Sequence, residues 1–350
     1  MDSRLKIELR TSPHLKQTVT VEQIMRHVVY ALLPVCAFAV YAFGISVLAL
    51  LTVTTLTCVL GEALFCRLSG KPSTVNDWSI VITGLLLGLT LPPGFPLWMA
   101  AVAGFVAVGL GKALFGGLGY NVMNPALVGR ACVQAAFPVA ITTWTPAFLQ
   151  HRFTEFIPST LTLPFMQPPA MGEWIAQAQV DAFSGATPLA LQKFEQITTP
   201  AGELFTGMTT GSAGETSALI ILAGGLYLAA RRMMDWRIPV GVLLGAALTS
   251  LPFWLMDSAR YPDPLFVLLS GGLMLGAVFM ASDMVASPVT PRGVWIYSLF
   301  IGALTVIIRL FGGLTEGVMY AILLGNAISP LIATVTQPRV FGAGERGPRT

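Results

Sequence analysis

Hydrophobic and polar positions alternate along the chain in long blocks, and the apolar blocks are close to the length that crosses a bilayer. A transmembrane helix needs about 20 apolar residues. Read with that length, the sequence predicts ten helices in two groups of five, separated by a long polar segment at 138–215. The predicted helices span residues 25–43, 45–66, 78–91, 97–115 and 122–137 in the first group and 216–230, 238–256, 265–282, 294–310 and 314–336 in the second.

Two of these predicted helices run into proline-rich breaks. The third is short and ends in Pro-Pro-Gly-Phe-Pro at 92–96, where proline removes a backbone donor and clashes with the preceding turn. Its counterpart in the second group runs into Asp283 and the sequence Ser-Pro-Val-Thr-Pro at 287–291. Discontinuous helices of this kind form the binding sites of many membrane transporters. We expect a site near these breaks, although a duplicated scaffold without an ion path of its own would give the same pattern.

The composition sharpens this picture. Hydrophobic residues make up 54% of the chain and charged residues only 11%, whereas a soluble domain carries about 25% charged residues. Such a chain cannot cover a water-facing surface, so its outer surface must face the lipid bilayer. We therefore predict an all-α polytopic membrane protein, and we exclude a soluble enzyme, a disordered tail and a nucleic-acid binder.

The distribution of lysine and arginine predicts the orientation, because positive charge is enriched on the cytoplasmic side. With ten spans and a cytoplasmic N-terminus, 15 of these residues fall inside and 4 outside, with Arg130 within a span. Both termini are then cytoplasmic and the 138–215 segment lies outside. The predicted divisions are a cytoplasmic segment (1–24), a first membrane repeat (25–137), an outer segment (138–215), a second membrane repeat (216–336) and a cytoplasmic tail (337–350).

The two groups of helices also resemble each other in sequence. Residues 114–131 read LFGGLGYNVMNPALVGRA and residues 310–327 read LFGGLTEGVMYAILLGNA, with 10 of 18 positions identical. The two copies occupy corresponding helices of two five-helix halves. Since five is odd, the halves are predicted to be inverted repeats, in opposite orientations across the membrane.

Several ionisable residues lie in or at the ends of predicted helices, where a charge costs several kcal/mol. For those near helix ends, including Lys112, we expect the side chains to extend to the membrane surface. Arg130 lies deeper, beside Asn121 and Asn124, and with Asp283 these residues form a candidate polar site within the membrane. Arg130 is suited to bind freed backbone carbonyls, a partner subunit or a polar ligand, and the sequence leaves these alternatives open. The ionisable residues of this group are Glu62, Lys112, Arg130, Asp283, Arg309 and Glu316.

The chain has four cysteines, none in a C-x-x-C pair and all in or beside apolar stretches. Iron–sulfur clusters and zinc sites use clustered thiolates. We therefore expect no metal site in this chain, and we interpret the cysteines as small buried hydrophobic residues.

A short motif in the predicted outer segment suggests a modification site. The segment contains Asp-Ala-Phe-Ser-Gly-Ala-Thr-Pro at 181–188. Thr187 followed by Pro188 is a favourable helix start, with threonine as the N-cap and proline in the first turn. Small neighbours leave the Thr187 hydroxyl open to an enzyme, and a phosphate esterified to it would meet the free N–H groups of a helix N-terminus. The residues alone do not identify what such a phosphate would carry.

The run DAFSGAT resembles the flavinylation motif, an Asp followed by S/T-G-A-T, through which FMN is joined to threonine by a phosphoester. Together with the ten predicted helices and the LFGGLGYNVMNPALVGRA stretch, the chain resembles one family of membrane proteins. This family is shared by the B-type subunit of the Na⁺-translocating NADH:quinone reductase and the D-type subunit of the Rnf (Rsx) electron-transport complex. The resemblance covers nearly the whole chain. The short N-terminal region and the length of 350 residues are closer to the Rnf protein.

The resemblance implies that Thr187 carries covalent FMN and that Asp181, Ser184, Gly185 and Ala186 form the recognition motif of a flavin transferase. It implies a subunit, inactive alone, of a translocase-type oxidoreductase complex in the bacterial inner membrane, with the FMN segment periplasmic. The complex would move electrons between NADH and ferredoxin, coupled to Na⁺ or H⁺ movement, and Rsx relatives are associated with keeping a redox-sensing regulator reduced. Its partners would be the other complex subunits, and a second, non-covalent flavin, riboflavin, would fit near the cytoplasmic side.

Two other functions remain open at this point. One is a channel or secondary transporter subunit in which Ser-Gly-Ala-Thr serves only as a structural helix cap. The other is an assembly subunit without a cofactor of its own. An accessible S-G-A-T motif on a long outer segment favours the flavoprotein over the channel or transporter, whereas loss of complex activity with no flavin on this chain would favour the assembly subunit.

Overall fold

The computed structural model describes residues 20–70, 74–166, 187–207, 209–215, 217–258, 260–313 and 315–338, together with Pro169 and Trp174. Within these residues the secondary structure is entirely helical, with no strand. The fold class is therefore the predicted one, an all-α membrane protein.

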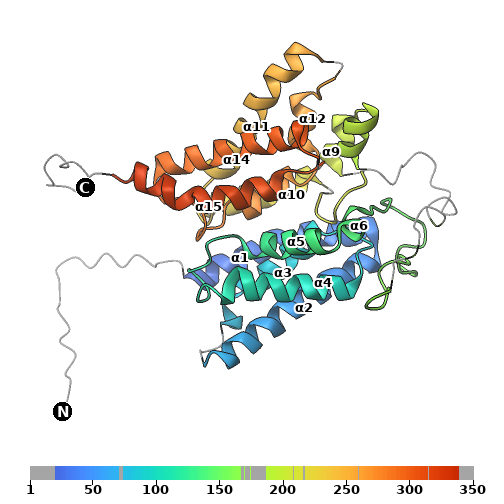
Figure 1. The fold of residues 1–350 in the computed structure, drawn as a ribbon, viewed down its shortest axis with the longest axis vertical. Helices are drawn as coiled ribbons and strands as arrows, with labels where there is room; N and C mark the ends of the chain where they lie inside the picture. Colours follow the sequence, from blue (N-terminus) through green and yellow to red (C-terminus); the bar gives the residue numbers. More distant parts are fainter. Residues whose placement is uncertain are drawn as a thin grey trace, which may run out of the picture.

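The helices of the first half lie together in the lower layer of Figure 1. Their bounds are α1 (Val21–Phe43), α2 (Ile45–Leu68), η1 (Val75–Asp77), α3 (Ser79–Thr90), α4 (Leu97–Val108), η2 (Gly109–Ala113), α5 (Pro125–Ala136) and α6 (Pro138–Thr142). α3 is only 12 residues long and ends just before the Pro92–Pro93 pair, as predicted. α4 continues into η2 as a single turn of π-helix, which shifts the side chains that follow.

The helices of the second half form the upper layer. Their bounds are α10 (Ala218–Ala230), α11 (Arg237–Met256), α12 (Pro264–Leu269), α13 (Leu273–Leu275), η4 (Gly276–Met280), α14 (Pro291–Phe311) and α15 (Val318–Thr336). The prediction of one continuous helix over 265–282 was wrong. The chain breaks between α12 and α13, because Gly271 adopts a left-handed conformation (φ +65°) that packs it against Leu189 and Arg309.

Five described helices are long and apolar enough to cross a membrane: α1, α2, α11, α14 and α15. Three further apolar helices are shorter, at Ser79–Thr90, Leu97–Ala113 and Ala218–Ala230. Short and broken helices are consistent with ten passages but do not establish that number, so the count of ten stays a prediction.

The two halves repeat the same neighbour relationships. In the first half α2 packs on α4, and α4 packs on α5; in the second half α11 packs on α14, and α14 packs on α15. The halves meet where α1 packs on α10 and where α5 packs on α15. This pattern agrees with the sequence repeat, and it places the 114–131 and 310–327 stretches at corresponding points of the two halves.

The segment between the two halves lies over one end of the helices. α1 begins and α15 ends on one side of the molecule, and α6 and α9 (Ala201–Thr206) lie on the other (Figure 1). Backbone hydrogen bonds fasten the segment to the first half, from Ile45 N to Arg152 O (2.9 Å) and from Gly214 N to Leu89 O (2.7 Å). The turn between α1 and α2 uses Gly44 at φ +77°, where a Cβ would overlap the Arg152 carbonyl. The described parts of the long segment are therefore packed against the helices of the fold.

Candidate functional site

Thr187 begins a helical run on the long segment, as the sequence predicts. It is the N-cap of α8 (Pro188–Ala190), and its Oγ1 accepts a hydrogen bond from the Ala190 N–H at 3.2 Å. α8 continues directly into the π-helix η3 (Leu191–Glu195), which Gln196 ends in a left-handed conformation. The Thr187 side chain is buried, with 3% of its surface exposed. The other motif residues, Asp181, Ser184, Gly185 and Ala186, lie outside the described residues.

A cavity of about 380 Å³ opens beside this helical run. Ala190 and Phe194 line it from the Thr187 side, and Trp144 lines it from the segment after α6. Arg130 of α5 and Glu316, which precedes α15, contribute its charged groups. The cavity thus combines two aromatic side chains with an arginine and a carboxylate, and its Ala190 and Phe194 lie within one or two turns of Thr187.

Arg130 and Glu316 connect the two halves of the protein. The Arg130 guanidinium donates to Glu316 Oε2 at 2.6 Å, and the two side chains are 9% and 17% exposed. Glu316 is not among the three partners that the sequence allowed for Arg130; contact with a partner subunit or a polar ligand stays a prediction. Glu316 lies 186 positions away in the other repeat, and helical spacing within one repeat cannot reveal such a contact.

Two further charged residues extend this pair. Arg309 of α14 is buried and donates to the carbonyl oxygens of Val267 (2.8 Å) and Ser270 (3.0 Å) at the end of α12. Glu215, just before α10, faces Gly272 together with Glu316: an added Cβ there would lie 3.5 Å from Glu215 Oε1 and 3.8 Å from Glu316 Oε1. The two carboxyl groups interact with each other. Four charged residues, from both halves and from the long segment, therefore meet next to the cavity.

Asn121, Asn124 and Asp283 form a different site, at the end of the molecule where α1 begins. Asn121 Nδ2 donates to Asp283 Oδ2 at 3.3 Å, and Asn124 Nδ2 donates to the Met280 carbonyl at 3.3 Å. Asn124 also caps α5 by accepting from the N–H groups of Ala126 and Leu127. The structure thus brings together three of the four residues of the predicted intramembrane site, whereas Arg130 lies with the Glu316 cluster.

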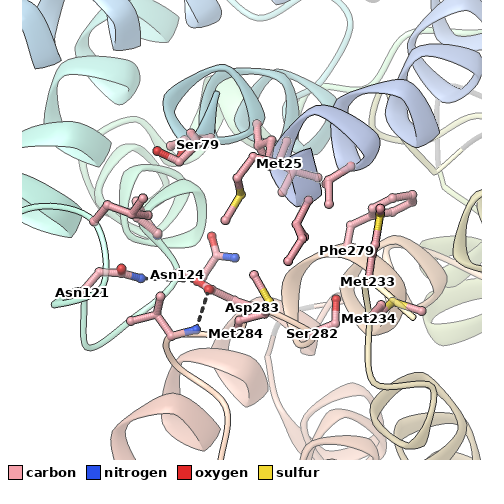
Figure 2. A pocket seen from close by; sticks show the side chains of 18 of the residues that line it. Met25, Ser79, Asn121, Asn124, Met233, Met234, Phe279, Ser282, Asp283 and Met284 are labelled. Atoms are coloured by element: carbon pink, nitrogen blue, oxygen red, sulfur yellow. Dashed lines mark hydrogen bonds between the residues drawn. The ribbon is translucent and has the colours of Figure 1, made fainter. Parts of the chain in front are cut away.

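These three residues line a pocket between the two halves. Figure 2 shows Asn121, Asn124 and Asp283 on one side of it, with Met233, Met234 and Phe279 on the other. The volume open to water is about 100 Å³. The pocket has an apolar wall with several methionines, which are flexible side chains that adapt to a bound group.

Lys112 lines the same pocket and corrects a prediction. Its ammonium does not extend to the membrane surface: the side chain is 4% exposed and donates to Glu62 Oε1 at 2.6 Å and to Ser79 Oγ at 2.8 Å. The hydroxyl of Thr74 donates to the same Glu62 oxygen. Lys112 lies in the π-helical turn η2, which directs it inward, and the sequence carries no clear signal for this change of direction.

The cysteines contribute no thiolate cluster within the described residues. All four are free thiols; Cys36 and Cys58 are buried and Cys66 and Cys132 are half-buried. No group of three or more metal-ligating side chains occurs in the described part of the chain.

The fold and these sites define a helical membrane protein whose two related halves are joined by buried charged and polar contacts. A model of the NQR2, RnfD, RnfE family matches residues 8–342, nearly the whole chain. The chain belongs to this family.

Individual relatives agree with the family assignment. All three described next are D-type subunits of ion-translocating complexes. The relative from the Proton-translocating ferredoxin:NAD(+) oxidoreductase complex of Clostridium ljungdahlii is 37% identical, over 95% of this chain and 96% of its own length. The relative from the Na(+)-translocating ferredoxin:NAD(+) oxidoreductase complex of Acetobacterium woodii is 40% identical, over 97% of this chain and 96% of its own length. The relative from the Ion-translocating oxidoreductase complex of Yersinia pseudotuberculosis is 36% identical, over 96% of this chain and 98% of its own length.

Proposed function

We propose that this protein is a membrane subunit of an ion-translocating ferredoxin:NAD⁺ oxidoreductase complex in the bacterial inner membrane. The support is its similarity, over nearly full length, to relatives named as the D-type subunits of such complexes. The relatives are named for proton and for Na⁺ translocation, so the family is compatible with either ion. The partners are the other subunits of the complex, and the chain is inactive alone.

Within the complex the chain carries FMN, joined by a phosphoester to Thr187. The observation that carries this proposal is the position of Thr187, at the start of a helical run and beside a cavity lined by Trp144, Phe194 and Arg130. The first N–H groups of the run are suited to a phosphate, because helix N–H groups and the helix dipole favour an anion. When bound, the flavin supplies the electron-transfer chemistry.

The residues around Thr187 fit a tethered flavin in three respects. Trp144 and Phe194 offer aromatic faces to a planar ring. Arg130 presents a cation to the electron-rich edge of such a ring, while its pairing with Glu316 keeps the guanidinium in place. The volume of about 380 Å³ lies within the range of small-molecule sites, about 300–1,000 Å³.

Attachment of the flavin requires access to a hydroxyl that is now buried. A flavin transferase would recognise Asp181, Ser184, Gly185 and Ala186 and reach Thr187 before the segment packs against the helices. The predicted orientation puts this segment in the periplasm and both termini in the cytoplasm. The role of Rsx relatives in keeping a redox-sensing regulator reduced would belong to the assembled complex.

The pocket at Asn121, Asn124 and Asp283 is our candidate for the second, non-covalent flavin, riboflavin. It lies at the end where α1 begins, which the lysine and arginine distribution predicts to be cytoplasmic. Its polar side offers amide and carboxylate groups to a ring edge, and its apolar side suits the ring faces. With about 100 Å³ open to water, the pocket takes a three-ring compound only when Met233, Met234 and their neighbours move aside.

Flavin fluorescence in a denaturing gel tests the covalent attachment. The full chain is expressed with and without a flavin transferase, as wild type, as Thr187→Ala and as Thr206→Ala, an exposed threonine of α9. We expect fluorescence only with the transferase, in the wild type and in Thr206→Ala but not in Thr187→Ala. If an active transferase leaves the well-expressed wild type unlabelled, Thr187 is a helix cap only, and the alternative of a channel or secondary transporter subunit takes first place.

A further inference from the structure

The Glu215 and Glu316 carboxyl groups lie next to each other in a partly buried part of the protein. Both carboxyls face Gly272, where an added Cβ would lie 3.5 Å from Glu215 Oε1 and 3.8 Å from Glu316 Oε1. The two side chains interact by a hydrogen bond. Two ionised carboxylates have only acceptors, so a hydrogen bond between them requires a proton on one of them. Among the residues that the structure describes, no N–H or O–H group donates to the buried Oε1 of Glu215.

The groups around the pair show which carboxyl carries the proton. Glu316 faces the Arg130 guanidinium at 2.6 Å, and its Oε1 accepts from the Gly272 N–H at 3.3 Å. Both contacts stabilise a carboxylate. Glu215 has only the Ser212 hydroxyl and the Glu316 carboxyl as hydrogen-bonding neighbours among the described residues. The proton therefore belongs on Glu215, which donates it to the ionised Glu316.

The surroundings favour a proton over a metal cation at this position. Arg130 and Arg309 both interact with the pair, from α5 and from α14. Lys193 of η3 lies just outside and donates to the Arg309 carbonyl at 2.9 Å. Two guanidinium groups beside two carboxyls disfavour a further cation such as Na⁺, whereas a shared proton lowers the mutual repulsion of the carboxylates.

The pair also has a route to water. Glu316 and Arg130 line the large cavity beside the Thr187 helical run as well as a small inner cavity of about 10 Å³ that Ser212 also lines. Arg130 is 7% exposed, and its Nε has no acceptor among the described residues. An inner cavity of this size is close to the minimum for one water, and a water there would accept from an arginine N–H.

We propose that Glu215 and Glu316 form a proton-binding site: the two carboxyl groups hold one proton between them and exchange it with water in the cavity beside the Thr187 helical run. The site contains residues of the first half, the second half and the long segment. Its protonation state therefore affects the contacts among all three. It does not depend on a flavin at Thr187.

Burial raises the pKa of the Glu215 carboxyl well above its usual range, and the Glu316 carboxyl adds to this shift. The folded state therefore holds a proton that the unfolded state releases above the ordinary glutamate pKa of about 4.3. Between the ordinary glutamate pKa and the raised pKa of Glu215, the folded state binds more protons than the unfolded state. The free energy of unfolding therefore falls as the pH rises through this range.

The test compares wild type, Glu215→Gln and Glu203→Gln as full chains in detergent; Glu203 is an exposed carboxyl of α9. The glutamine amide replaces the donated proton with an N–H and cannot ionise. We expect Glu215→Gln to lose the fall in Tm across the pH window, while Glu203→Gln keeps it. An unchanged pH dependence in Glu215→Gln would overturn the proposal.

Infrared spectroscopy gives a second readout that does not depend on the stability of the variant. We expect the wild type to show the C=O band of a protonated carboxyl above the ordinary glutamate pKa of about 4.3, sensitive to deuterium exchange and lost when the pH is raised further. Glu203→Gln should keep this band and Glu215→Gln should lose it. If the band is the same in all three chains, or if Na⁺ abolishes it in the wild type, the site does not hold the proposed proton.

Discussion

Arg130 and Glu316 lie 186 positions apart in the chain, yet the guanidinium of one donates to the carboxylate of the other at 2.6 Å. Each belongs to one copy of the internal repeat or its immediate surroundings, so the contact joins the two halves at their α5–α15 interface. This pair is both a structural bridge and one wall of the cavity beside Thr187. The same two residues thus connect the stability of the fold with its candidate cofactor site.

Removing one member of this pair is expected to destabilise the protein. Arg130→Leu leaves the largely buried Glu316 without its partner, and an uncompensated buried charge costs about 3–5 kcal/mol. The double variant Arg130→Leu/Glu316→Leu should recover much of that loss, because a hydrophobic replacement of both members is often nearly neutral. Thermal unfolding in detergent measures both effects. A double variant that is less stable than either single variant would contradict this account of the pair.

Lys112 is expected to be as sensitive as Arg130, although the sequence places it near a helix end. Lys112→Leu leaves Glu62 buried with Thr74 as its remaining donor, and we expect a loss of a few kcal/mol by the same reasoning, about 3–5 kcal/mol. Arg67→Leu, at an exposed position of α2, is the control and should have little effect. Equal thermal stability of Lys112→Leu and Arg67→Leu would show that the buried pair is dispensable.

The crossing of α11 and α14 should not tolerate a side chain at Gly302. A Cβ there would overlap the carbonyl oxygen of Val242, and Gly245 faces α14 in the same way. Overpacking of a tight interface costs about 1–3 kcal/mol, so Gly302→Ala should lower the Tm. Gly202→Ala, at a position with open space around it, is the matched control. An unchanged Tm in Gly302→Ala would mean that the helices can separate without loss.

Thr187→Ser should keep both the helix cap and the hydroxyl that accepts flavin. Serine and threonine are similar N-caps, whereas Thr187→Ala should lose about 1 kcal/mol of stability. We therefore expect normal membrane levels in both variants, with covalent fluorescence in Thr187→Ser and none in Thr187→Ala. A collapse of the Thr187→Ala protein in the membrane would indicate that the threonine is mainly structural.

The candidate site could be predicted only in part. The N-cap role of Thr187 depends on a local pattern of four or five residues, so it was visible in the sequence. The sequence also grouped Asn121, Asn124 and Asp283, but together with Arg130, which the structure places with Glu316 instead. The partners of Arg130 and Lys112 were missed. Glu316 and Glu62 are distant in sequence, and apolar helix faces give no indication of which charged residues will meet.

The sequence by itself determined the fold class, the position of most helices and the internal repeat, because these follow from local hydrophobicity, proline positions and similarity between two stretches. Tertiary structure alone decided that α12 and α13 are separate and that Lys112 turns inward through a π-helical turn. It also decided that four charged residues meet next to the cavity beside the Thr187 helical run. The physical reason is that a buried charge is stable only with a partner. The packing of two halves against each other, and not the order of residues along either one, selects that partner.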